Sequence, residues 1–428
     1  MKERVAVIRQ PARYDDGLVQ ASVAGAMQAL GLRWSELVQP GQRVVLKPNF
    51  IRQSRTERTD EWEQIITNGT VIAAVARAVA EAMNGRGTIT IADAPQTDSD
   101  FDAICLRARL PELREQFTKK FPELTLEVLD LRREVWRTVD GVIVERRKLP
   151  FDPRGDTMVN LGEKSFFYGK HGRFYGADYD SSFTQQHQAH GRHEYLLSRS
   201  AMDADLFVNL PKLKTHKKVG LTVSLKNLVG INGDKNYLPH FCLGTPDEGG
   251  DEFPTSDVKA KVQSQLITAF KAAARKSGRA VQWWGPVAKR IGSRIFGDTN
   301  EVVRSGNWYG NDTAWRMVLD LNRALFGFDG LGRPRQKPLR YLSIVDGIVA
   351  GEGNGPMEAD AKPCGVLLAG TNPFAVDLVA ARLMGFDWRK LPMIREGITA
   401  DQVEVVPELG EVFRFKPHFG WKGHIEAG

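Results

Sequence analysis

DLFVNLPKLKTHKKVGLTVSLKNLVGINGDKNYLPH, residues 205–240, is the stretch that decides the predicted fold. The apolar run Leu206–Leu210 predicts a buried strand, which Pro211 ends. Cations, amides, a hydroxyl and imidazoles follow at once, in a predicted loop–helix–loop. Open α/β sheets bind their ligands at this carboxyl end of the strands. We therefore expect a ligand site directly after Leu210.

The charge of this stretch indicates the kind of ligand. It holds six lysines but only two acids, Asp205 and Asp234, which favours a phosphate, a carboxylate or a sugar acid. A solvated basic surface is the alternative. The basic residues are interleaved with apolar and glycine positions, and this spacing favours a built site: Val219, Leu221, Leu225, Leu228 and Gly230.

Strand and helix signals alternate on both sides of this stretch. Apolar runs predict strands at Val5–Arg9, Arg43–Lys47, Thr88–Ala92, Leu124–Leu129, Arg340–Val345 and Gly365–Ala369. Helical spacing predicts helices at Leu18–Leu30, Thr70–Met83, Phe101–Phe117 and Pro373–Met384. This alternation is typical of βαβ units, so we predict an α/β fold with an open, mostly parallel sheet and helices on both faces.

The predicted domain is discontinuous. Residues 1–249 and 336–428 form its two parts, and residues 250–335 form an inserted basic helical subdomain. Within the first part, Glu134–Arg147 predicts a hairpin around Asp140–Gly141, and residues 163–195 predict a structured loop over the site. Short strands are expected in residues 402–418.

Composition restricts the function. The chain has 428 residues, a net charge of +7 and three separated cysteines, which form no disulfide framework, zinc ribbon or iron–sulfur motif. The first residues lack the pattern of a signal peptide, so a cytoplasmic protein is expected. The charge is too diffuse to favour nucleic acid. The sequence has neither GxGxxG after the first strand nor GxxxxGK[ST], which disfavours NAD and P-loop nucleotide sites.

Two early strands end in polar residues that could converge. Lys47 and Asn49 follow one strand, and Asp93 and Gln96 follow another. Parallel strands place such ends on one edge of the sheet. The alternatives are a lysine that covers the sheet edge and an aspartate that caps a turn or helix.

The glycine-rich segment VDGIVAGEGNGP, residues 345–356, follows an apolar strand. Its glycines, Gly353 and Gly355 among them, would let backbone N–H groups approach an anion. Asp346 and Glu352, together with Asp377 in the helix that follows, offer oxygen ligands to magnesium, manganese or calcium. The same carboxylates could instead cap helices, pair with lysines or bind the substrate.

Histidines are concentrated in one segment. HQAHGRH contains His187, His190 and His193 in an H-x2-H-x2-H spacing that could bind zinc, iron or nickel. His193 ranks highest of the three because it leads directly into a predicted strand. A loop histidine bonded to backbone is the alternative for each.

Two residues of the central stretch are candidates for catalysis. The imidazole of His216 titrates near neutrality, and the lysines beside it favour its neutral, basic form. Lys226 lies in the apolar run VSLKNLVG, where burial would lower the pKa of its amine and free it as a base, a nucleophile or an anion anchor. The alternative for Lys226 is a structural ion pair with Asp346 or Asp377.

The segment 258–297 carries nine lysines and arginines and no acid, with apolar residues at helical spacing and a Trp283–Trp284 pair. A basic helix with tryptophans is typical of peripheral contact with an anionic membrane. The alternative is an amphipathic helix packed on the sheet with its basic face in water.

Several of these blocks together resemble a known family. NLPKLKTH, GLTVSLKNLVGINGDKNYLPH, the upstream LKPN, and the downstream VDGIVAGEGNGP and GTNPFAVDLVAARLMG occur in the order found in domain-of-unknown-function family 362 of bacteria and archaea. Many members of that family carry a ferredoxin-like cysteine cluster or an export signal, and this sequence has neither. The resemblance implies a shared site but no reaction. The site residues that it implies are Lys47, Asn49, Lys212, Lys214, Thr215, His216, Lys226, Asn227, Asp346, Glu352, Gly353, Gly355 and Asp377.

We therefore expect an enzyme that acts on an anionic small molecule, such as a sugar or nucleotide-sugar derivative. Catalysis is assigned to His216 and Lys226, and a divalent metal could assist through Asp346, Glu352, Asp377 or His193. Substrate binding is assigned to Lys47, Asn49, Lys212, Lys214, Thr215, Asn227, Gly353 and Gly355. One alternative is a non-catalytic ligand-binding or assembly protein at the membrane. Another is a transition-metal enzyme that uses the 187–193 histidines.

Overall fold

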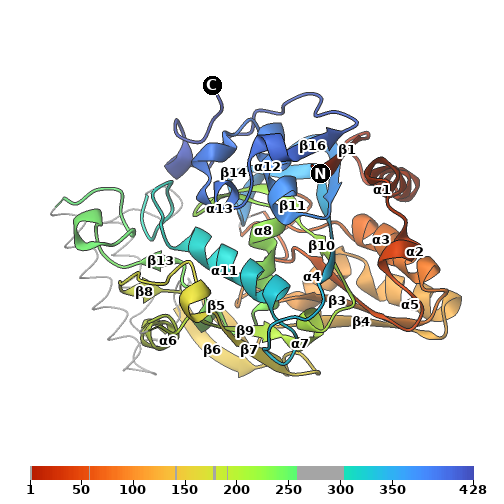
Figure 1. Cartoon of the computed structure of the whole chain (residues 1–428), viewed down its shortest axis with the longest axis horizontal. Coiled ribbons are helices and arrows are strands. Elements are labelled where there is room, and N and C mark those ends of the chain that lie inside the picture. Colours follow the sequence, from red (N-terminus) through yellow and green to blue (C-terminus); the bar gives the residue numbers. More distant parts are fainter. Residues whose placement is uncertain (1, 57, 140–141, 177–179, 190, 258–302) are drawn as a thin grey trace.

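A large sheet runs through the centre of the molecule (Figure 1). The computed structural model describes residues 2–56, 58–139, 142–176, 180–189, 191–257 and 303–428. Within these residues the main sheet has ten strands. Eight of them lie in the order β16 (Val403–Val406), β1 (Glu3–Arg9), β15 (Glu358–Gly370), β14 (Arg340–Asn354), β10 (Leu206–Leu210), β2 (Arg43–Pro48), β3 (Gly87–Asp93) and β4 (Leu124–Asp130).

The sheet is mostly parallel, as predicted. Strands β14, β10, β2, β3 and β4 are parallel neighbours, whereas β15 runs antiparallel to both β14 and β1. Two further strands, β11 (Lys212–His216) and β12 (Gly220–Thr222), extend the sheet beyond β10. The carboxyl ends of β10, β2 and β3 therefore meet at one edge, beside β11.

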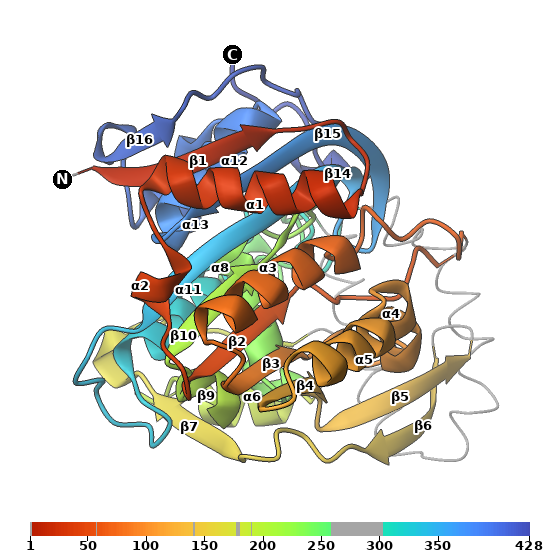
Figure 2. The same ribbon diagram turned by 90° about the vertical axis from the view of Figure 1, so that its right-hand side faces the viewer.

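Helices cover both faces of the sheet (Figure 2). One face packs against α1 (Asp16–Leu30), α3 (Gly69–Ala82), α4 (Phe101–Arg107) and α5 (Leu110–Lys120). The other packs against α8 (Ser224–Asn227), α11 (Ala314–Gly327), α12 (Pro373–Met384) and α13 (Pro392–Arg395). Side chains alternate between the two faces along β2, so both faces need a cover: Val44 and Leu46 lie in the first core and Val45 lies in the second.

Short elements complete the described chain. They comprise α2 (Trp34–Leu37), the hairpin β5 (Glu134–Val139) and β6 (Val142–Lys148), the pair β7 (Asp156–Asn160) and β9 (Glu194–Ser198), the pair β8 (Phe174–Tyr175) and β13 (Phe241–Cys242), α6 (Ser181–His187) and α7 (Arg199–Met202). The hairpin was expected. Residues 163–195, predicted as a loop, contain β8 and α6, and β8 pairs with the strand that follows His240.

Local signals explain most of the boundaries. The Asn372 side chain accepts from the backbone N–H groups of Phe374 and Ala375 to begin α12, and Gly385 ends it at φ 80°. The helix predicted over Phe101–Phe117 is divided into α4 and α5 at Arg109, whose φ is 53°. Of the tail 402–418, only Val403–Val406 forms a strand.

One helix of the predicted inserted subdomain shares the core of the main domain. Helix α11 lies within 250–335, yet Trp315, Val318 and Leu319 belong to the same hydrophobic core as Val219 and Leu225. It therefore packs into the main domain. The predicted basic helices at 258–297 lie outside the described residues. Among the described helices, none has the length and apolar character that a membrane crossing requires.

Candidate functional site

The stretch after Pro211 forms a strand where a loop was predicted. Strand β11 pairs with the second half of β14 and with β12, so Lys212 and Lys214 project from a sheet. The glycine-rich segment is likewise strand, and its glycines make room for neighbours. A Cβ on Gly351 would lie 2.9 Å from the carbonyl oxygen of Gln64 and 3.0 Å from the Cβ of Lys214. The glycines thus allow close strand packing.

Lys212 belongs to a group that we call the paired cluster, made of Tyr14, Lys212 and Asp346. The Lys212 Nζ donates to Asp346 Oδ2 at 2.9 Å and to the Tyr14 hydroxyl at 2.7 Å, and that hydroxyl donates to Asp346 Oδ1 at 2.9 Å. Backbone N–H groups of Asn68 and Ile348 also donate to Asp346. The charges of Lys212 and Asp346, both fully buried, are balanced within this group.

Buried amides connect the strand ends. Asn49 donates to Asn227 Oδ1 at 2.8 Å, and Asn227 donates to Asn209 Oδ1 at 2.7 Å and to the carbonyl of Lys47 at 3.1 Å. Lys214 Nζ donates to Asn49 Oδ1 at 2.7 Å and also to the carbonyl of Ile65. This network joins β2, β10, β11 and α8.

Lys47 and Asp93 meet at the ends of β2 and β3. Their Nζ and Oδ1 atoms form a buried ion pair at 2.8 Å, and Asp93 Oδ2 accepts from the Phe50 N–H at 2.6 Å. Gly230 passes directly over the pair, since a Cβ there would lie 1.8 Å from Asp93 Oδ1 and 2.7 Å from Lys47 Nζ. The glycine is required by this close approach.

A second group of lysines, which we call the open cluster, comprises Lys47, Lys214, Lys226 and Lys235. Lys235 Nζ donates to the carbonyl of Ala94 at 2.8 Å. Lys226, 8% exposed, has no hydrogen bond or ion pair with any described residue. The alternative role of Lys226, a structural ion pair with Asp346 or Asp377, is therefore not observed. Asp93 is the carboxylate in direct contact with the open cluster.

The surroundings lower the pKa of every lysine in the open cluster. Burial, together with Lys235 and Lys47, lowers the pKa of Lys226 to about 7. Burial also lowers the pKa of Lys235 to about 8, although Asp93 opposes that shift. The pKa of Lys214 falls well below its usual value because of burial and the neighbouring lysines. An anion placed here would reverse these shifts.

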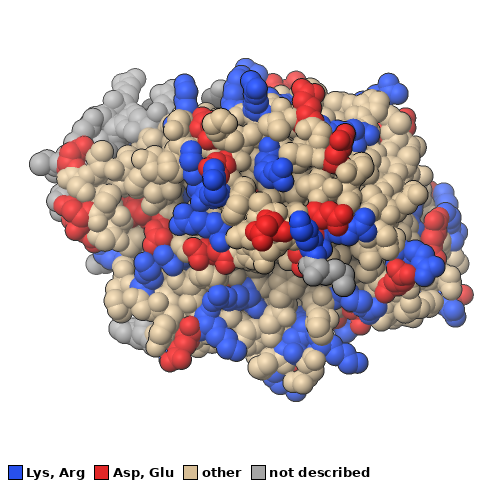
Figure 3. All heavy atoms as spheres, turned by 45° about the horizontal axis from the view of Figure 1, so that its top comes forward, with Lys and Arg blue, Asp and Glu red and all other residues tan. Residues whose placement is uncertain are grey.

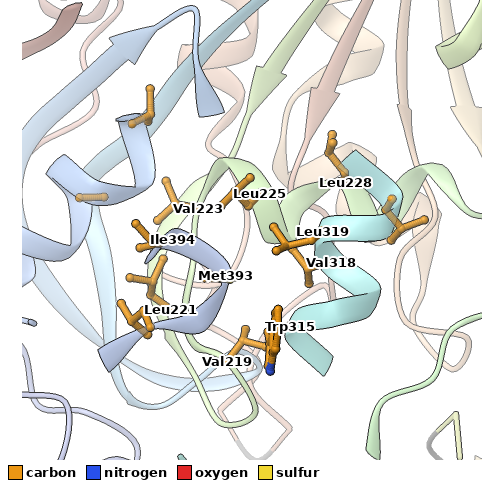
Figure 4. Packing of buried hydrophobic residues seen from close by; sticks show 14 of the residues in the cluster. Val219, Leu221, Val223, Leu225, Leu228, Trp315, Val318, Leu319, Met393 and Ile394 are labelled. Atoms are coloured by element: carbon orange, nitrogen blue, oxygen red, sulfur yellow. The ribbon is translucent and has the colours of Figure 1, made fainter. Parts of the chain in front are cut away.

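Lys226 is held on a short, fixed helix. Asp377 accepts from the N–H groups of Ser224 and Leu225 at 2.7 and 3.1 Å, so it anchors the first turn of α8. Burial raises the pKa of Asp377 to about 7. Figure 4 shows the apolar contact of the same segment, in which Leu225 and Leu228 face Val318 and Leu319 of α11. Asp377 therefore positions the open cluster.

Hydrogen bonds assign a different tautomer to each of two histidines near Lys226. The Nδ1 of His216 accepts from the N–H groups of Lys218 and Val219 at 3.0 and 3.3 Å, so its proton lies on Nε2. His240 Nδ1 donates to the Leu238 carbonyl at 2.8 Å, which leaves a lone pair on Nε2. Burial and Lys226 lower the pKa of both, to about 3 for His240. Both rings are therefore neutral at pH 7.

The predicted metal ligands are not brought together. Glu352 bonds to Lys362 Nζ at 2.8 Å and to the Lys416 N–H at 2.9 Å, while Asp346 and Asp377 are engaged as described above. His187 bonds to Glu194 at 2.6 Å and His193 lies 3.4 Å from Gln188 Oε1. His190 is outside the described residues. The described chain holds no group of three His, Cys, Asp or Glu side chains arranged for a metal.

The remaining predicted residues lie where the end of β11 meets the end of β14. Thr215 Oγ1 donates to the carbonyl of Gly353 at 3.0 Å. The N–H of Gly353 donates to Lys416 O and that of Gly355 to Gly353 O, so both amides bond within the protein. A Cβ on Gly355 would lie 2.1 Å from the Thr215 carbonyl. Close packing explains Gly355, and the positive φ of 77° explains Gly353; the contact of both with an anion stays a prediction.

Three residues beside the predicted ones were missed. Lys235 and His240 lie in the quoted stretch, and their positions among six lysines and two histidines were the available signal. Tyr14, in contrast, lies on the segment before α1, and nothing in the local sequence indicates its bond to Asp346. Gln96, predicted beside Asp93, uses its backbone to bond Ile51 and Arg132.

The open cluster is distinct from ordinary surface charge. Figure 3 shows one face of the molecule, on which lysine and arginine side chains are interspersed with aspartate and glutamate. On that face no large area carries a single sign. The open cluster differs because its lysines are buried or half-buried and in contact with only one described carboxylate.

The fold and this arrangement define the class: an α/β protein with a cluster of buried lysines at the carboxyl edge of a mostly parallel sheet. Residues 122–382 match the model of the family described as Domain of unknown function (DUF362), and the chain belongs to this family. The matched residues include Lys212, Lys226, Lys235 and Asp346. The resemblance inferred from the motifs is confirmed.

Two further similarities were found. The chain is 26% identical over 392 residues to the thylakoid-associated protein sll1697 of Synechocystis sp., covering 92% of this chain and 78% of that protein. A structural-genomics crystal structure of a Thermotoga maritima protein matches with a TM-score of 0.35 and 10% identity. That match covers 91% of this chain, which spans 60% of the Thermotoga protein.

Proposed function

We propose that the protein binds a small phosphate- or carboxylate-bearing molecule at the open cluster and catalyses a proton transfer on it. The observation that supports this proposal is Lys226: a buried amine, surrounded by cations, without a described partner. Buried charges in proteins are normally paired. An anionic ligand is the partner that the arrangement lacks.

The charge balance supports an anion over a cation or a neutral ligand. Four lysines converge, and Asp93 balances one of them through its contact with Lys47. A dianion bound between Lys226 and Lys235 would favour the protonated form of each amine. Each would then donate a charge-assisted hydrogen bond, which contributes about 1.5–3 kcal/mol.

The proton-transfer roles differ from those expected from the sequence. His216 was expected to act as a general acid or base, and its occupied Nδ1 lone pair and protonated Nε2 leave only the role of donor. It is suited to donate a hydrogen bond to a negative oxygen, as a neutral imidazole can. Lys226 and the Nε2 of His240 are the groups with a free lone pair, so the base is assigned to them.

Sulfate binding tests the anion site, because sulfate does not titrate near neutral pH. The affinity of the protein for sulfate should be measured by calorimetry at pH 7 and constant ionic strength. Lys226→Met should weaken it about 10- to 100-fold, as expected for one charge-assisted bond. Lys119→Met removes the same charge from an exposed helix surface and should change little. Equal affinities in all three proteins would refute the proposal.

A second candidate is a ligand-binding or assembly protein at the membrane surface, without catalysis. The relative named as thylakoid-associated favours it, together with the basic segment 258–297 and its two tryptophans. A cytoplasmic location suits both candidates. Sedimentation with anionic liposomes separates them: salt-sensitive binding that is lost in Trp283→Ala/Trp284→Ala supports the peripheral role.

Divalent-metal assistance stays a prediction. Elemental analysis of untagged protein would test it directly, independently of sulfate binding. A stoichiometric metal that is lost in Glu352→Gln or His193→Ala would support it.

A further inference from the structure

We propose that the ligand carries a ketone or aldehyde beside its anionic group, and that Lys226 condenses with this carbonyl to form a protonated imine. The inference rests on the proposed function and specifies its substrate class. The argument depends on three features of the open cluster: the availability of the Lys226 lone pair, the two histidines of opposite tautomer, and the neighbouring cations.

Lys226 differs from the other lysines in the availability of its Nζ. Lys47 forms an ion pair with Asp93 and donates to the Pro48 carbonyl, Lys214 donates to Asn49 and Ile65, and Lys235 donates to Ala94. These bonds occupy the amine and favour its protonated form. Of the four lysines of the open cluster, only Lys226 has no acceptor for its protons among the described residues. It is therefore the candidate nucleophile.

An amine must be neutral to attack a carbonyl, and the surroundings of Lys226 favour the neutral form. Burial and the nearby Lys235 and Lys47 lower its pKa to about 7, whereas an exposed lysine has a pKa of about 10.4. A lysine in an apolar site or beside another cation is the usual form of an activated amine nucleophile. Both conditions hold here.

The two histidines are placed to move the protons of the condensation. Lys226 lowers the pKa of His216 and of His240, so all three groups are electrostatic neighbours. The His240 Nε2 lone pair can accept the proton that the attacking nitrogen loses. The His216 Nε2 carries a proton and can donate it to the developing alkoxide.

The step balances without an external reagent. The Nζ lone pair forms the C–N bond while the carbonyl π bond breaks onto oxygen, and one proton passes from nitrogen to oxygen to give a carbinolamine. Loss of the hydroxyl with a second proton, as water, then leaves the C=N bond. Amine, carbonyl and one proton thus give a protonated imine and water, with no change in oxidation state.

The anionic end of such a ligand would be held by the rest of the cluster. Lys235 is half-buried, and Lys47 is an electrostatic neighbour of both Lys235 and Lys226. A carboxylate or phosphate bound there would leave the carbonyl carbon near Nζ. The protonated imine would then serve as an electron sink for removal of a proton from the adjacent carbon.

Reductive trapping tests the inference. Glyoxylate, pyruvate and pyridoxal 5′-phosphate carry both an anion and a carbonyl, and each should be incubated with the full-length protein and cyanoborohydride at pH 7. Peptide mass spectrometry should locate a reduced adduct on Lys226 with at least one probe, and sulfate should suppress it. Lys226→Arg, which keeps the charge, should abolish it. Lys119→Met, on an exposed helix surface, should leave it on Lys226.

The outcomes separate this inference from the proposed function. Sulfate binding without any adduct on Lys226 overturns the imine and leaves the anion site intact. Adducts spread equally over Lys226 and exposed lysines also overturn it, because selectivity is the claim. Absence of sulfate binding, with no adduct, overturns both.

Discussion

Lys212 and Lys226 lie fourteen positions apart in the sequence and are both buried, yet their surroundings are opposite. Lys212 donates to Asp346 and Tyr14, so its charge is balanced inside the protein. Lys226 has other lysines as neighbours and no described partner. The paired cluster therefore contributes to the fold, and the open cluster is the place where a ligand is needed to complete the charge balance.

The largest effect is expected in the paired cluster. Lys212→Met would leave Asp346 buried without its counter-charge, and breaking a buried pair in this way typically costs about 3–5 kcal/mol of unfolding free energy. Urea denaturation measures the loss. The double variant Lys212→Met/Asp346→Asn should regain a large part of the stability, since it leaves no isolated charge. If Lys212→Met left the free energy of unfolding unchanged, the Lys212–Asp346 pair would not stabilise the fold.

Lys226→Met provides the direct contrast. Replacing an amine that is buried without a partner removes a desolvation cost, so the free energy of unfolding should be unchanged or higher at pH 7. The same denaturation experiment measures it. A loss comparable to that of Lys212→Met would show that Lys226 has an internal partner and that the comparison fails.

Gly230→Ala should displace residues of the open cluster by a steric clash, without changing any charge. Its Cβ would lie 1.8 Å from Asp93 Oδ1, so the Lys47–Asp93 pair must move, and overpacking of this kind costs about 1–3 kcal/mol. The free energy of unfolding and the sulfate affinity should both decrease. Gly327→Ala, at the end of α11, has no atom within 4 Å of its Cβ and is the matched control. Equal behaviour of the two variants would refute the close approach.

The pH dependence follows from the amines of the open cluster. The folded pKa values of about 7 for Lys226 and about 8 for Lys235 lie below the unfolded value of about 10.4. The unfolded chain therefore binds more protons between pH 7 and 10, and these two groups make stability rise with pH in that window. The limiting slope is about 1.4 kcal/mol per pH unit for each proton.

Anion affinity should change in the opposite direction. Sulfate favours the protonated amines, so its affinity should fall as pH rises above 7, approaching about tenfold per unit for one proton taken up. Calorimetry in buffers of different ionisation enthalpy counts that proton. Lys226→Met should remove much of the dependence, and a pH-independent affinity in the unmodified protein would contradict the assigned roles.

The smallest effect is expected from Tyr14→Phe. This change removes a hydroxyl that accepts from Lys212 and donates to Asp346 but retains the ion pair, so a loss of about 1 kcal/mol is expected. Thermal unfolding at two salt concentrations measures it. Tyr168→Phe, at a 54% exposed tyrosine, should change stability much less. A larger loss in the second variant would argue against the paired cluster.

The fold was largely predictable because periodicity reports burial. Apolar runs and helical spacing located β2, β3, β10, α1, α3 and α12 close to their observed bounds. The strand β11 was missed because its lysines interrupt the apolar pattern, and those lysines are buried only through bonds to distant partners. Asp346 lies 134 residues after Lys212. Sequence spacing gives no information on such a bond.

The convergence of the early strand ends was predictable, but the contacts of the individual side chains there were not. The ends of two early strands were expected to bring Lys47 and Asn49 near Asp93, and Lys47 and Asp93 form an ion pair at 2.8 Å. The division of the lysines into paired and open clusters depends on side-chain contacts, and so does the tautomer of His216. Glycines at 353 and 355 resembled an anion-binding turn, because a positive φ, as at Gly353, and close packing, as at Gly355, favour glycine just as close ligand approach does.

Titration of the lysine side chains by NMR tests the central claim most directly. Lysines labelled with ¹⁵N should show Lys226, assigned by loss of its signal in Lys226→Met, with a pKa of about 7 in the free protein. Saturating sulfate should raise that value while leaving the signal of Lys212 unchanged. A pKa near 10 for Lys226, unaffected by sulfate, would show that its charge is already balanced and would contradict the account.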